Sequence, residues 1–108
     1  MQNFLNGLTT YLDKSMPFNR EQKSDWLLTP VQYIRLNQAQ QESDFLGAGY
    51  CDYLDTTNCL VLLYGNSKED YHSHHVKVVS PDGFENVYSF EHSRVFFYGY
   101  MAAITLIN

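Results

Sequence analysis

The spacing of apolar positions changes near the middle of the chain, from a helical repeat to a strand-like repeat. In the first third, an apolar stripe from Phe4 to Leu12 predicts a helix that ends near Ser15. From Gly47 onward, apolar residues alternate with polar ones or form short unbroken runs, which is typical of strands. Helices followed by strands predict an α+β domain, with N-terminal helices packed on one face of a four- to five-stranded, mostly antiparallel sheet.

The clearest helix start in the sequence is at residues 29 and 30. Thr29 is a favourable N-cap, and Pro30 suits the first helical position because its missing N–H is not needed there. We expect this helix to run to about Gln41 and to bury Val31 and Ile34 on one side. The same letters, "VQYIRLN", are also compatible with an extended segment.

A shorter helix is predicted just before it. Asn19 and Gln22 have the spacing of a capping box, which would open a helix through Leu27. Two helices joined by the short "LLTP" link also allow a helix-turn-helix, in which Arg35 and its Gln and Asn neighbours contact bases. Few basic residues accompany this segment, so a helical layer that covers the sheet is the simpler interpretation.

The strand region opens with a predicted hairpin. The segments "GYCDYLD" and "CLVLLYG" flank three polar residues, 56–58, and the second segment is apolar on both faces, so it is expected to be a central strand. Further strands are predicted within residues 71–80, 84–91 and 94–107. The last of these is expected in the middle of the sheet. If it lay at the edge it would pair two chains, so both a monomer and a homodimer stay open.

The turn "SPDG" fixes a register between two of these strands. Residues 80–83 suit a type I turn followed by a glycine bulge, which makes a three-residue hairpin loop. Counting back from the turn places Val78 opposite Asn86 and Val76 opposite Tyr88. This register separates apolar from polar residues, which supports it independently.

The same register assigns the residues of the histidine-rich stretch "DYHSHHVKV" to the two faces of the sheet. His75 falls on the predicted solvent face with Lys77. The core-facing side gathers three histidines at one end: His72, His74 and His92. A slip by one residue would bring Glu91 beside the first two instead, so a third ligand is available in either register and the signal has little specificity.

Three imidazoles at one strand end allow two kinds of role. They can bind zinc with an open fourth position, which would make a hydrolase or hydratase site, or one can act as an acid or a pH sensor. The simpler interpretation is that His72 and His74 end the strand, with ring bodies inward and nitrogens bonded to water or backbone carbonyls. The chain has no H-E-x-x-H and no C-x-x-C motif, so no cofactor is expected and zinc is the alternative.

Charge narrows the choice of partner. The net charge is −5, and no basic residue occurs between Leu36 and Ser67, where acidic residues accumulate. Such an interval repels nucleic-acid phosphates and membrane surfaces and attracts basic protein surfaces. We therefore expect a basic protein partner, no direct nucleic-acid binding and no membrane association.

Tyrosines and carboxylates interleave along the predicted hairpin and the loop after it. Tyrosine offers a large, rigid contact area at low entropic cost, and carboxylates steer a basic partner. The predicted partner-binding residues are Tyr50, Asp52, Tyr53, Asp55, Glu69, Asp70 and Tyr71. The simpler alternative is ordinary strand tyrosines beside solvated acids.

Cys51 and Cys59 lie in apolar segments and are interpreted as buried, reduced thiols. The amino terminus has neither the basic region nor the apolar run of a signal peptide, so a cytoplasmic location is expected.

Together these features predict a single domain over residues 1–108 without an enzyme signature. The favoured hypothesis is a small acidic protein-binding module. It would inhibit a basic partner, such as a nucleic-acid-binding protein, by occluding its active site or nucleic-acid groove. Immunity proteins, antitoxins and phage anti-defence proteins are of this type. A zinc enzyme and a helix-turn-helix DNA-binding protein are the alternatives.

Overall fold

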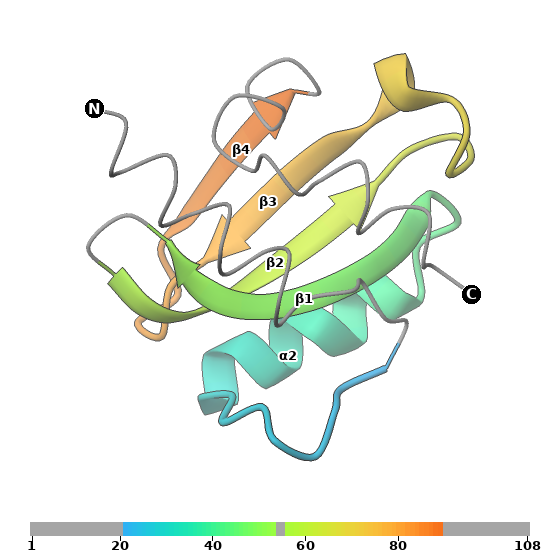
Figure 1. Cartoon of the computed structure of the whole chain (residues 1–108). Coiled ribbons are helices and arrows are strands. Elements are labelled where there is room, and N and C mark those ends of the chain that lie inside the picture. Colours follow the sequence, from blue (N-terminus) through green and yellow to red (C-terminus); the bar gives the residue numbers. More distant parts are fainter. Residues whose placement is uncertain (1–20, 54–55, 90–108) are drawn as a thin grey trace, which may run out of the picture.

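In the part of the chain that the structure describes, one α-helix packs on a four-stranded antiparallel sheet (Figure 1). The computed structural model describes residues 21–53 and 56–89. Within these ranges the elements are α2 (Pro30–Gln40), β1 (Phe45–Tyr53), β2 (Thr56–Tyr64), the 3-10 turn η1 (Tyr71–Ser73), β3 (His75–Val79) and β4 (Glu85–Ser89). The strand order is β1-β2-β3-β4. The expected α+β class is therefore confirmed, whereas the helix predicted over residues 4–15 and the strand predicted over 94–107 lie outside the described residues.

Helix α2 begins where its sequence predicts. Thr29 is the N-cap, and a capping box forms because the Thr29 hydroxyl accepts from the Gln32 N–H while the Gln32 side chain accepts from the Thr29 N–H. The shorter helix expected through Leu27 is wrong, since residues 21–29 contain only a turn and irregular backbone. Pro30 disfavours a helical Thr29, and Trp26 is buried in the core, so this segment follows the packing of Trp26 instead.

The face of α2 that meets the sheet is not the predicted one. Its buried residues are Gln32, Leu36 and Ala39, whereas Ile34 is 51% exposed and Val31 is half-buried. A count of apolar residues favours the face with Val31 and Ile34. The structure instead buries a glutamine, because the sheet offers that glutamine backbone partners.

Gln32 makes three hydrogen bonds with its buried side chain. Its Nε2 donates to the carbonyl of Asn58 in β2 at 2.9 Å and to the carbonyl of Val79 at the end of β3 at 3.0 Å. Its Oε1 accepts from the Thr29 N–H at 3.0 Å. The Thr29 hydroxyl in turn donates to the carbonyl of Pro81 in the β3–β4 turn at 2.8 Å. The first turn of α2 is thus bonded to β2, to β3 and to the turn that leaves β3.

Strand β2 is interior, as predicted, and every residue from Cys59 to Tyr64 is buried. Its side chains Leu60, Leu62 and Tyr64 face α2 and join the core that includes Trp26 and Phe45. The alternate residues Val61 and Leu63 face the other side of the sheet and are also buried. A strand that is apolar on both faces accepts a helix on either face, so the alternation of β2 does not decide where α2 packs.

The register predicted from the "SPDG" turn is confirmed. Val78 lies opposite Asn86 and Val76 lies opposite Tyr88. The turn closes with a bond from the Ser80 N–H to the Phe84 carbonyl at 2.9 Å, and Gly83 has the expected positive φ of 94°.

The orientation of the β3–β4 hairpin differs from the prediction. His75 and Lys77 share the face that α2 packs on, because they pair with Tyr64 and Leu62 of β2. They were assigned to the solvent face, but both are half-buried. The alternation of apolar and polar residues correctly identifies which residues of β3 and β4 share a face. Pairing with β2 determines which of the two faces meets the helix.

Replacing Gln32 by alanine is expected to lower the free energy of unfolding by about 2–4 kcal/mol, because the buried Val79 carbonyl, the Asn58 carbonyl and the Thr29 N–H lose their partner. Asn37→Ala, on the exposed side of the same helix, is expected to change it by no more than about 0.5 kcal/mol. Urea denaturation followed by circular dichroism measures both. Equal effects of the two substitutions would contradict the role assigned to Gln32.

Candidate functional site

Four exposed carboxylates gather at one end of the sheet. Glu42 and Asp44 follow α2, and Glu69 and Asp70 lie in the loop that follows β2. The two segments meet because the Gly65 N–H donates to the Asp44 carbonyl at 2.9 Å, next to the start of β1 and the end of β2. We call these four residues the acidic end.

The loop of the acidic end is held by its own polar groups. The Ser73 hydroxyl accepts from the Asn66 N–H at 2.8 Å and donates to the Asp70 carbonyl at 2.7 Å. The Asn66 side chain donates to the Asp70 carboxylate at 3.2 Å. These bonds give the Asp70 carboxylate one defined position rather than leaving it on a free chain.

The buried side chain of His74 also holds this loop in place. It is 2% exposed, and its Nε2 lies 2.6 Å from the Ser67 carbonyl, so Nε2 carries a proton and donates it. Its ring packs so closely over Gly65 that a Cβ at residue 65 would collide with Cδ2 of the imidazole. Glycine at position 65 therefore makes room for the buried imidazole.

The acidic end changes the chemistry of a neighbouring tyrosine. Burial raises the pKa of the Tyr64 hydroxyl to about 12. The negative charges of Glu42 and Asp44 add to this rise in the pKa, followed by that of Glu85. The Tyr64 ring is stacked on His75 with centroids 5.1 Å apart. A negative potential therefore reaches from the acidic end into the edge of the core.

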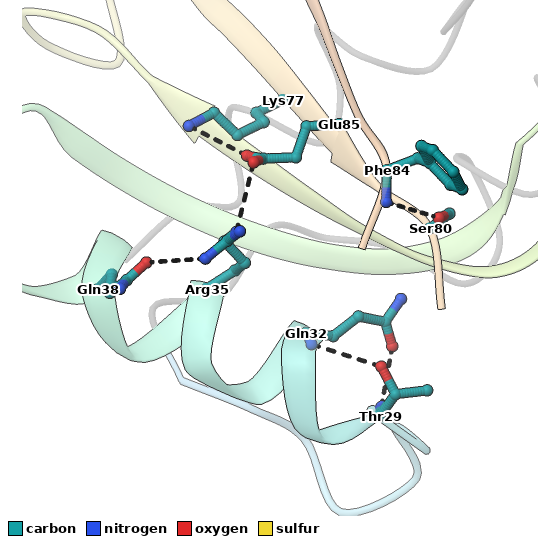
Figure 2. A network of polar contacts seen from close by, with 8 residues as sticks. All are labelled: Thr29, Gln32, Arg35, Gln38, Lys77, Ser80, Phe84 and Glu85. Carbon is teal, nitrogen blue, oxygen red and sulfur yellow. Dashed lines mark hydrogen bonds and ion pairs between the residues drawn. The ribbon is translucent and has the colours of Figure 1, made fainter. Parts of the chain in front are cut away.

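On the face of the sheet that α2 covers, two cations share one carboxylate (Figure 2). Glu85 of β4 lies 3.4 Å from Lys77 Nζ and 3.3 Å from Arg35 Nε, and about a third of each side chain is exposed. The Arg35 Nε–H does not point at the oxygen, so this attraction is Coulombic rather than a hydrogen bond. Gln38 accepts a long bond from Arg35 Nη1 at 3.4 Å. Such partly exposed pairs contribute about 0–1 kcal/mol.

This arrangement removes the basis for the helix-turn-helix alternative. Residues 21–29, which should have supplied the first helix of the motif, are not helical. Arg35, expected to contact bases, lies against Glu85 instead.

Two of the predicted partner-binding residues have internal roles in the described structure. Tyr50 is half-buried, stacks on Trp26 with centroids 5.9 Å apart, and donates its hydroxyl to the Leu27 carbonyl at 3.2 Å. Asp52 accepts from the N–H of Asn58 at 3.0 Å. Asn58 has a φ of 60° where the pairing of β1 with β2 shifts, so Asp52 supports an irregularity of the hairpin.

The predicted residues do not form one surface. Asp52 lies near the end of β1 that joins β2, whereas Glu69 and Asp70 lie at the opposite end of these strands, roughly 25 Å of strand away. Asp55, and the side chains of Tyr53 and Tyr71, lie outside the described part of the chain. The residues that join Glu69 and Asp70 are instead Glu42 and Asp44, which the acidic interval of the sequence contained but which were not assigned to the site.

The histidines are separated as well. The strand predicted to include His72 begins only at His75, and His72 is exposed in η1 while His74 is buried. His74 bonds a backbone carbonyl, as expected for a histidine that ends a strand. In residues 21–53 and 56–89, no three His, Cys, Asp or Glu side chains are grouped to hold a metal. His92, the third predicted ligand, lies outside the described residues.

The cysteines are buried thiols, as predicted. Cys51 and Cys59 lie directly opposite each other in β1 and β2, and neither forms a disulfide. Burial raises the pKa of the Cys51 thiol to about 12, and the neighbouring Cys59 and Asp52 add to the rise in the pKa. At neutral pH this thiol is therefore a poor nucleophile.

Comparison with protein-family models, with curated protein sequences and with solved structures finds no significant match for this chain. Among the described residues, no helix has the length and apolar character needed to cross a membrane.

In the native protein, Cys51 and Cys59 are expected to resist alkylation by iodoacetamide at pH 8 and to react fully in denaturant, because burial excludes the reagent from both and raises the pKa of the Cys51 thiol. Mass spectrometry counts the modified thiols. A Val87→Cys variant is the matched control, since that β4 position is 60% exposed and should react at once. Rapid native alkylation of the wild-type chain would refute the burial of both thiols.

Stability is expected to decrease at alkaline pH partly through Tyr64. Because folding raises the pKa of Tyr64 from 10.0 to about 12, its contribution is fully present below pH 10 and is lost as pH rises toward 12. Tyr64→Phe should make the free energy of unfolding fall less steeply over this window, as measured by urea denaturation at a series of pH values. The same slope in both proteins would contradict this assignment.

Proposed function

We propose that this chain is a protein-binding module whose acidic end binds a basic partner and inhibits it. The observation that carries the proposal is the convergence of four exposed carboxylates, from two separate segments, at one end of the sheet. Inhibition follows if this end covers the active site or nucleic-acid groove of the partner, as immunity proteins, antitoxins and phage anti-defence proteins do.

The bonded loop supports this function. A carboxylate held in position before binding loses little entropy when it meets a lysine or arginine, so more of the electrostatic attraction appears as affinity. The Asp70 carboxylate is held in this way by Asn66, and the loop behind it by Ser73 and His74. Lys68 of the same loop offsets part of its charge, and the net charge of the whole chain is −5.

The charge also selects the class of partner. Carboxylates at this end attract lysine and arginine side chains and accelerate encounter with a basic surface. They take the place of phosphates if the partner is a nucleic-acid-binding protein. The same charges repel nucleic acids and anionic membranes, so the proposal includes neither as a direct ligand. Cysteines without a disulfide suit the reducing cytoplasm, which is the location we propose.

The proposal is tested by neutralising the acidic end. A triple variant, Glu42→Gln, Asp44→Asn and Glu69→Gln, should lose the partner captured from the native cell extract at low and moderate salt. Its Kd for the isolated partner should rise at least about tenfold, because each lost charge pair weakens both steering and contact. The matched control, Glu21→Gln, Asp25→Asn and Asp82→Asn, removes the same charge from exposed positions elsewhere.

Three outcomes would reject the proposal: no protein captured at either salt, equal loss of the partner in both triple variants, or retention by the acidic-end variant. Retention of the wild-type chain on DNA, with a steep dependence on salt, would also reject it, because an acidic end cannot bind phosphates directly.

A further inference from the structure

The outward face of α2 carries no charge. Its exposed positions are Pro30, Tyr33, Ile34, Asn37, Gln38 and Gln41. Arg35, the sole charged residue of this helix, lies against Glu85 of β4 rather than on the outward face. A helix on the surface of a chain with a net charge of −5 would ordinarily expose charged residues. Here the outer face is as uncharged as the inner one.

Two large apolar side chains lie on this face with much of their surface in water. Ile34 and Tyr33 are each 51% exposed, and Leu27, just before the helix, is 76% exposed. Ile34 lies near the middle of the outer face, because it is about 200° around the helix from buried Gln32 and is flanked by Asn37 one turn later. The arrangement is an apolar centre surrounded by amides, which resembles the composition of a small interface.

We propose that this outward face of α2 binds the same face of a second copy of the chain, with the two helices antiparallel. In a two-fold interface, each residue near the axis meets its own copy, so a charge there would repel itself. The outer face of α2 has none.

The ends of the helix favour the antiparallel orientation. The first turn of α2 has no acidic residue, and Glu42 is exposed just beyond its C-cap, Gln41. The helix is about 16 Å long, so in an antiparallel pair Glu42 of one copy lies near the helix N-terminus of the other. A carboxylate is stabilised at that position by the helix dipole. In a parallel pair the two Glu42 side chains would lie together and repel.

The expected dimer is weak. A single helix of 11 residues with its flanking segment gives an interface at the low end of the known sizes, so a Kd on the order of 10–100 µM is expected. This association does not depend on the function proposed above, although Glu42 belongs both to the acidic end and to the edge of the expected dimer interface.

Sedimentation velocity of the full chain over a concentration series tests the dimer. The wild type should shift from monomer to dimer within the expected range of concentration. Ile34→Glu and, as a second variant, Asn37→Glu should each raise the Kd at least about tenfold, because they place like charges at the two-fold axis. Val87→Glu is the matched control: Val87 is similarly exposed, at 60%, but lies on β4, so its substitution should leave the Kd nearly unchanged.

A separate variant tests the antiparallel orientation of the two helices. Glu42→Lys should weaken the dimer by several-fold at low salt, because it places a cation at the positive end of the partner helix. A wild-type chain that stays monomeric at about ten times the highest expected Kd would overturn the proposal, as would equal effects of Ile34→Glu and Val87→Glu. A tighter dimer with Glu42→Lys would overturn the antiparallel arrangement.

Discussion

The arrangement of this domain depends on one buried amide. Gln32 is fully buried, and its side chain donates to carbonyls of β2 and β3 while it accepts from the N–H of its own N-cap residue, Thr29. An amide whose donors and acceptor are bonded in this way is compatible with a core. Without Gln32, the two carbonyls would lose this hydrogen-bond partner. The position of α2 over the sheet is therefore set by directional bonds at its first turn. Apolar contacts of Leu36 and Ala39 then complete the packing.

Both proposed surfaces follow from this position of the helix. Because Gln32 fixes the start of α2 beside the start of β2 and the end of β3, the helix runs along β1 and β2, and its C-terminal end delivers Glu42 and Asp44 next to the loop after β2 (Figure 1). The same rotation about the helix axis turns Ile34 to the outside, where it is 51% exposed. If the face with Val31 and Ile34 met the sheet instead, the outer face would lose its apolar centre.

Much of the fold is predictable from local patterns. The N-cap at Thr29, the interior position of β2, and the turn with its register follow from short-range rules that tertiary contacts did not override. The buried face of α2 was not predictable in this way, because a hydrophobic pattern counts Gln32 as polar. The candidate site was predicted in part: Glu69 and Asp70 belong to it, but Asp52 lies at the other end of the strands. Proximity along the sequence does not reveal which strand ends meet in space.

The central claim is that the bonds of Gln32 make the helix and the sheet one cooperative unit. Native-state hydrogen exchange measured at single amides tests it directly. The amides of Leu36 and Ala39 in α2 should exchange with the same free energy of opening, and the same dependence on denaturant, as that of Leu62 in β2. If the helix amides exchanged through a local opening of much lower free energy while β2 stayed protected, α2 would not be bound to the sheet in the way described, and the account would be contradicted.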